Sequence, residues 1–103
     1  MTIVGSGGVK FDKFDASQRF AKDYKKLDQA LQAKVNEKLR DLLCDPKPPG
    51  LRFEKLSGHS KPDIYTFHVT GNYKVSLELR RVDGVCIAFL RAVGNHDKID
   101  RFP

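Results

Sequence analysis

The segment IYTFHVTGNYKVSLELR (residues 64–80) decides the fold that the sequence predicts. Apolar and polar residues alternate along YKVSLELR (73–80), as they do in a strand with one buried face. The apolar set is Tyr73, Val75, Leu77 and Leu79, and the polar set is Lys74, Ser76, Glu78 and Arg80. IYTFHV (64–69) predicts a second strand, and Thr70-Gly71-Asn72 predicts the tight turn between them. An antiparallel hairpin is therefore expected here.

Further strands are expected on both sides of this hairpin. VCIAFLRAV (85–93) follows an Asp83-Gly84 turn and is apolar on both faces, which is typical of a central strand. LRFEKL (51–56) and VKFDKF (9–14) alternate and predict two more strands. The result is a mostly antiparallel sheet of four to five strands.

A helical hairpin is expected between the first strand and the rest of the sheet. Apolar residues recur at helical spacing from Phe20 to Leu42. Asp15 followed by Gln18 is a capping-box pattern and places the first helix start at Asp15. Asp28 is the expected cap of a second helix, which runs to about Cys44. These elements predict an α+β fold, with both helices on one face of the sheet and the other face polar and open.

Length and composition describe one small domain. With 103 residues, the chain is expected to have a flexible glycine-rich lead-in at 1–8 and a single folded domain at 9–103. No apolar run approaches a membrane span and no signal peptide is evident, so a cytoplasmic location is expected. Cys44 and Cys86 lack metal-ligand spacing and are expected to be free, buried residues. The net charge of +6 favours a polyanionic partner such as nucleic acid, the ribosome or an acidic protein.

The open face of the sheet is the expected site of chemistry. His68, Lys74, Ser76, Glu78 and Arg80 should share it, and Arg91 lies near the exit of the last strand. A turn at Gly94-Asn95 would bring His96, Asp97, Arg101 and Phe102 over the rim of the sheet. Two imidazoles can supply the base and the acid for RNA cleavage by a 2′-hydroxyl, and the cations can stabilise phosphate charge without any metal ion or cofactor. Each residue also has a structural alternative, namely a polar side chain on a solvated sheet or tail.

The order of three segments resembles the RelE/ParE toxin superfamily of bacterial toxin–antitoxin modules. They are EKLSG (54–58), IYTFHVTGNYKV (64–75) and VGNHDKIDRF (93–102), and the resemblance extends from about Phe11 onward. It is closest to the RelE/YafQ-like mRNA interferases. It implies a toxin that cuts mRNA in the ribosomal A site. It also implies an antitoxin partner, which is typically a disordered acidic segment that folds on the toxin.

The same resemblance implies roles for individual residues. Lys74 matches a mid-sheet arginine, His96 a histidine or arginine after the glycine, and Phe102 a closing aromatic. His68 is similar to a sheet histidine of the YafQ-type branch, which has an aspartate where Asn72 stands here. The implied catalytic residues are His96 as acid, His68 as base, and Lys74 and Arg91 for phosphate charge. The implied RNA-binding residues are Arg80, Arg101, Phe102 and Tyr73.

Two other functions remain open from the sequence. A ParE-like member of the same fold would poison DNA gyrase and would need neither histidine. A small basic RNA- or ribosome-binding module would bind RNA in a salt-sensitive manner and leave it intact.

Overall fold

The computed structural model describes residues 9–44, 46–56, 58 and 62–103. The lead-in expected at 1–8 lies outside the described residues. So do Asp45 of the expected connector and Ser57 of the EKLSG segment.

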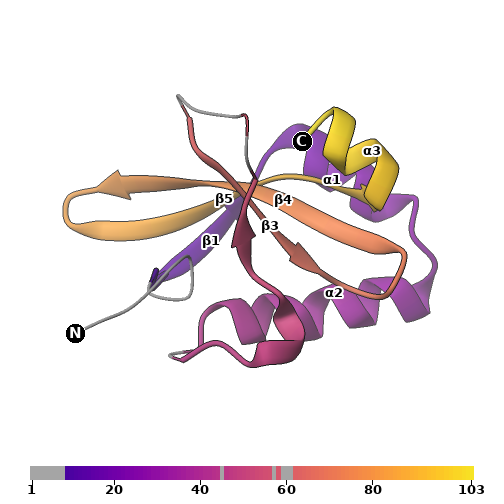
Figure 1. Ribbon diagram of the computed structural model, residues 1–103, viewed down its shortest axis with the longest axis horizontal. Helices are drawn as coiled ribbons and strands as arrows, with labels where there is room; N and C mark the ends of the chain where they lie inside the picture. The colour runs from indigo at the N-terminus through magenta and orange to yellow at the C-terminus, as the bar shows by residue number, and fades with distance from the viewer. Residues whose placement is uncertain (1–8, 45, 57, 59–61) are drawn as a thin grey trace.

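Three α-helices and a five-stranded sheet make up the described part of the chain (Figure 1). The elements are β1 (Lys13–Ala16), α1 (Gln18–Lys25), α2 (Gln29–Leu42), the 3-10 helix η2 (Pro49–Leu51), β2 (Glu54–Lys55), β3 (Ile64–His68), β4 (Tyr73–Val82), β5 (Val85–Asn95) and α3 (His96–Arg101). The strand order is β1-β5-β4-β3-β2, in which β1 runs parallel to β5 and the remaining pairs are antiparallel. This confirms the α+β prediction and the mostly antiparallel sheet.

The helical hairpin covers one face of the sheet, as the alternation in β4 predicts. Val75 and Leu77 of β4 are fully buried in one cluster with Val35, Leu39 and Leu42 of α2. Burying side chains of this kind contributes about 1.5–3 kcal/mol each. The packing therefore fixes which face of each strand is apolar.

The first helix begins at a different residue from the one expected. Ser17 is its N-cap, with the hydroxyl accepting a hydrogen bond from the Phe20 amide. Asp15 is wrong as the cap because it belongs to β1, where it pairs with Phe89 and accepts from the Ala16 amide. The second cap is confirmed, since the Asp28 carboxylate accepts from the Leu31 amide.

Two predicted strands are shorter or displaced. The first strand spans Lys13–Ala16, whereas 9–14 was expected. The strand expected at 51–56 is reduced to Glu54–Lys55, because Leu51 ends a 3-10 helix and Arg52 has a left-handed conformation with φ of 52°. Such a conformation interrupts an extended chain.

One cysteine prediction is wrong. Cys86 is buried as expected, but Cys44 is exposed, with its thiol donating to the carbonyl oxygen of Arg40. Both are free.

The second face of the sheet is polar, but it is not open, and this corrects the sequence prediction. Lys74, Ser76 and Glu78 point away from the main core, yet each is less than a tenth exposed. Helix α3 packs on β4 and β5 on the side opposite α2, and its Ile99 is fully buried (Figure 1). The short C-terminal helix therefore acts as a second layer.

Two local features set the geometry of β4 and β5. Asp83 and Gly84 have φ of 52° and 78°, which is the primed turn expected for a two-residue hairpin. In the middle of the pair the register shifts: Ser76 is opposite Ala92 while Leu77 is opposite Leu90. Arg91 is thus the extra residue of a β-bulge, a device that often aims a side chain at a site.

Candidate functional site

The two histidines singled out in the sequence lie against each other. His68 ends β3 and His96 begins α3, and their ring centroids are 4.8 Å apart with an angle of 84° between the planes. The predicted meeting of the tail and the sheet is thereby confirmed at these two residues. Each imidazole is half-buried. One or both can take part in proton transfer near neutral pH.

Three local contacts define the start of α3. Asn95 caps it, because its side-chain oxygen accepts from the Lys98 amide. The His96 amide donates to the carbonyl oxygen of Asn72 in the β3–β4 loop. Gly94 leaves room for the Lys98 side chain, since a Cβ there would be 3.0 Å from the Lys98 Cδ. These contacts place the His96 ring beside His68.

Lys74 lies next to the histidine pair and is already bound to a carboxylate. It is the cross-strand partner of His68, and its Nζ is 2.6 Å from Asp100 Oδ1 of α3. The Lys74 side chain is 7% exposed, and Asp100 supplies the opposite charge that a buried cation needs. A cation is therefore held beside two imidazoles, as phosphate chemistry needs.

The environment of His68 disfavours the protonated form of its imidazole. Burial lowers the pKa of His68 below its ordinary value, and the nearby charges of His96, Lys74 and Arg52 lower it further. The charge of Glu54 raises the pKa of His68, but the other effects outweigh it. Sequence reasoning missed Arg52 and Glu54. Arg52 and Glu54 are near His68 because β2 pairs with β3. The alternation of apolar and polar residues did not give the bounds of β2, so this pairing could not be predicted.

His96 has an unused nitrogen. In the part of the chain that the structure describes, its Nε2 is one of three buried side-chain atoms without a hydrogen-bond partner; the others are Thr66 Oγ1 and Ser76 Oγ. Buried polar atoms are nearly always paired in folded proteins. A histidine that exchanges a proton with a substrate needs one imidazole nitrogen that no protein group occupies. The unpaired Nε2 of His96 meets this requirement.

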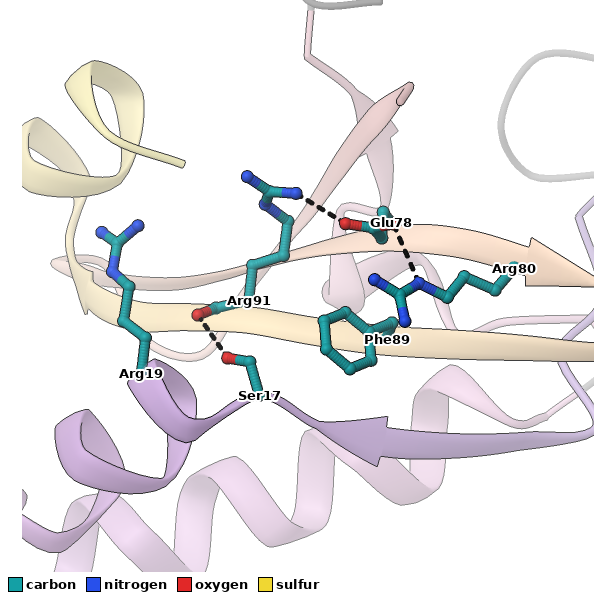
Figure 2. A pocket seen from close by; sticks show the side chains of 6 residues that line it. All are labelled: Ser17, Arg19, Glu78, Arg80, Phe89 and Arg91. Atoms are coloured by element: carbon teal, nitrogen blue, oxygen red, sulfur yellow. Dashed lines mark hydrogen bonds and ion pairs between the residues drawn. The ribbon is translucent and has the colours of Figure 1, made fainter. Parts of the chain in front are cut away.

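A second polar cluster lies farther along the same face of the sheet (Figure 2). It lines a pocket of about 280 Å³ formed by Ser17, Arg19, Glu78, Arg80, Phe89 and Arg91, which we call the arginine pocket. Glu78 is its centre, with Oε1 2.6 Å from Arg91 and Oε2 2.9 Å from Arg80. The Arg80 guanidinium stacks 3.7 Å from the centroid of the Phe89 ring. Arg91 is therefore grouped with Glu78 and Arg80, not with the histidine pair.

Glu78 is ionised in this cluster. Burial acts to raise its pKa, but hydrogen bonds and charge from Arg80 and Arg91 outweigh that effect and the pKa is lowered. With three arginines and one carboxylate, the lining of the arginine pocket keeps an excess of positive charge.

The remaining predicted residues lie at the edges of these two clusters. Phe102 is 66% exposed at the end of α3. Arg101 is mostly exposed and pairs with Asp97 at 3.6 Å. Tyr73 packs against the main core, on the opposite face from Lys74, so it does not share a surface with the histidines.

Two further findings concern metal binding and membrane-spanning helices. Within residues 9–44, 46–56, 58 and 62–103, no group of three or more histidine, cysteine, aspartate or glutamate residues is placed to hold a metal ion. No helix in those ranges has the length and apolar character to cross a membrane.

Solved structures identify the architecture. The fold resembles YafQ from E. coli strain BL21(DE3), with a TM-score of 0.64, 17% identity, and coverage of 84% of this chain and 94% of that one. It also resembles the archaeal RelE–RelB complex from Pyrococcus horikoshii OT3, with a TM-score of 0.62, 17% identity, and coverage of 84% and 96%. The chain has the RelE fold.

A third structure with the RelE fold comes from an assembly. The E. coli DinJ–YafQ toxin–antitoxin complex matches with a TM-score of 0.57 and 18% identity, and the match covers 88% of this chain and 98% of that one. No protein-family model and no curated protein sequence matches the chain. At these identities the RelE fold is shared while most side chains differ, so function must be argued from the site.

Proposed function

We propose that the protein is the toxin of a toxin–antitoxin module and acts as a metal-independent endoribonuclease on mRNA in the ribosomal A site. The observation that carries the proposal is the His68–His96 pair beside Lys74. The RelE fold supports it, because the structures that share it include YafQ and a RelE–RelB complex. This activity would place the protein in the cytoplasm.

The base in this mechanism is His68. Its lowered pKa keeps the imidazole unprotonated at neutral pH, so it can take the proton from the 2′-hydroxyl that attacks the phosphate. Lys74 stabilises the negative charge that develops on the phosphate oxygens. His96 gives a proton to the leaving 5′-oxygen. The products are a 2′,3′-cyclic phosphate and a free 5′-hydroxyl, and the proton gained by His68 balances the proton lost by His96.

The geometry requires a rearrangement when RNA binds. With 4.8 Å between centroids, the two rings leave no room for a phosphate between them. Lys74 is also occupied by Asp100. Since His96 and Asp100 both belong to α3, one shift of this six-residue helix opens the histidine pair and frees the lysine. Such local rearrangements are common where an active site is completed by its substrate.

An antitoxin is the expected protein partner. RelE and YafQ are each found in complexes, with RelB and DinJ respectively. The net charge of +6 suits an acidic segment that folds on the toxin surface.

The test is primer extension on a message in a translating bacterial extract, with wild type, His96→Ala, His96→Gln and His68→Gln. In-frame cuts that require translation and disappear in all three variants support the proposal. Lys34→Gln, an exposed change on α2, serves as the control and should cut normally. Full cutting by the histidine variants would contradict it. Growth inhibition that survives a His68/His96 double substitution would instead point to the gyrase-poison alternative.

A further inference from the structure

The arginine pocket has no task in the acid–base mechanism described above. Glu78 and Lys74 are four residues apart on the same face of β4, which corresponds to about 13 Å along the strand. The pocket is therefore close to the histidine pair but does not touch it. One single strand of RNA can reach both, because small single-strand-binding domains cover several nucleotides.

The structure shows how this pocket holds an oxygen acceptor. Arg19 Nη1 and Arg91 Nε lie 3.5 Å and 3.3 Å from the same backbone oxygen, that of Pro103. Arg19 also donates through Nη2 to the carbonyl oxygen of Phe102. Two guanidinium groups from distant parts of the chain thus converge on one oxygen, and phosphate oxygens are acceptors that guanidinium groups bind well.

The remaining parts of the pocket fit the rest of a nucleotide. Arg80 is stacked on Phe89 and its side chain is about half exposed, which leaves the outer face of the guanidinium available to a base. Bases stack on arginine planes and aromatic rings without regard to sequence. Glu78 holds Arg80 and Arg91 in place, so less side-chain entropy is lost when RNA binds.

We propose that the arginine pocket binds one nucleotide of single-stranded RNA next to the nucleotide that is cut. Its phosphodiester takes the place of the Pro103 oxygen between Arg19 and Arg91, and its base stacks on Arg80. This inference rests on the proposed ribonuclease function and adds a position for a second nucleotide. The backbone oxygen of Phe102 accepts from Arg19 of this pocket, and Phe102 itself is 66% exposed.

A binding measurement tests the pocket without any cleavage. The probe is a fluorescent 12-nucleotide RNA with 2′-O-methyl groups throughout, which cannot be cut by 2′-hydroxyl attack. Arg19→Gln/Arg80→Gln is the informative variant, since it leaves the Arg91–Glu78 pair in place. Lys34→Gln/Arg40→Gln removes the same charge from α2, whose buried residues pack on the opposite face of the sheet. Thermal unfolding of each variant checks that it is folded.

The expected result is a loss of RNA affinity of about 10-fold in the pocket variant and less than about 2-fold in the control. The slope of log affinity against log salt should fall by about 0.7 for each phosphate contact removed. Equal affinities for wild type and the pocket variant, or equal losses in both variants, would overturn the proposal. So would competition by inorganic phosphate as strong, per phosphate, as that by unlabelled RNA, because the pocket would then be a free-anion site.

The two proposals fail separately. If the pocket variant binds RNA weakly but no form of the protein cuts a message, the pocket stands as an RNA-binding site and the ribonuclease proposal falls. If cutting depends on His96 while the pocket variant binds normally, the reverse holds.

Discussion

Lys74 Nζ lies 2.6 Å from Asp100 Oδ1, with 7% of the lysine side chain and 51% of the aspartate side chain exposed. The buried partner is the cation, and the accessible partner is the anion supplied by α3. A phosphate that reached Lys74 would have to displace this carboxylate. The ion pair therefore stabilises the closed arrangement at the expense of substrate binding.

Asp100→Asn is expected to weaken the fold and to strengthen RNA binding. Lys74 would lose its charged partner, which should lower the free energy of unfolding by about 1–2 kcal/mol, less than for a fully buried pair because Asp100 is half exposed. The freed lysine should bind the uncleavable RNA several-fold more tightly. Urea unfolding and fluorescence anisotropy measure the two effects. Unchanged affinity in a destabilised protein would show that Lys74 does not meet phosphate.

The free energy of unfolding should depend on pH because of the lowered pKa of His68. Its pKa in the folded state is below the ordinary value of 6.5, so the unfolded chain binds the proton more tightly. The free energy of unfolding should therefore fall as the pH drops below about 6.5 and level off below the folded-state pKa. Urea titrations between pH 5 and pH 8 should show this slope in wild type. His68→Gln should reduce it, and a slope that is the same in both proteins would contradict the assignment.

Ser17→Ala tests the observed helix start. The Ser17 hydroxyl accepts from the Phe20 amide and donates to the Arg91 carbonyl oxygen, so its loss removes both a cap and a tie between α1 and β5. The expected cost is about 1–2 kcal/mol. Asp15→Ala is the matched comparison, with an expected change within about 0.5 kcal/mol because the residue is exposed in β1. Equal costs in thermal unfolding would restore Asp15 as the cap.

Glu78→Gln should show whether this carboxylate orders the arginine pocket. Its pKa is below the ordinary value of 4.5, so its stabilising effect is present above that pH and disappears as the pH falls through the folded-state pKa. At pH 7 we expect the variant to be less stable than wild type by about 1–2 kcal/mol. In acid the two proteins should converge. A difference that persists unchanged down to pH 3 would mean that the side chain acts through packing and not through charge.

The sequence predicted those parts of the fold that depend on periodicity. Alternation in β4 and helical spacing from Phe20 to Leu42 are strong patterns, and the structure follows both. The boundary at Asp15 was wrong because two capping residues stand close together, and only the parallel pairing of β1 with β5 selects Ser17. Pairing of this kind is not visible in local sequence.

The predicted site was right about the meeting of His68 and His96 and wrong about the openness of the surface. The tail GNHDKIDRFP reads as polar, yet Ile99 is fully buried and anchors it on the sheet together with the Lys74–Asp100 ion pair. The separation of Arg91 from the histidine pair follows from the bulge, a one-residue irregularity that strict alternation cannot reveal. The catalytic roles of all these residues stay predictions.

The bulge at Arg91 also makes the last strand tolerant of one kind of genetic change. On either side of it, Leu90 is opposite the buried Leu77 and Ala92 is opposite Ser76, so the two faces of β5 follow regular alternation once Arg91 is left out. An in-frame loss of the single codon for Arg91 would therefore keep Val93 in the core and His96 on the same side of the sheet. Such a deletion would remove one guanidinium from the arginine pocket without altering any histidine, lysine or aspartate, and the protein that carries it should still fold.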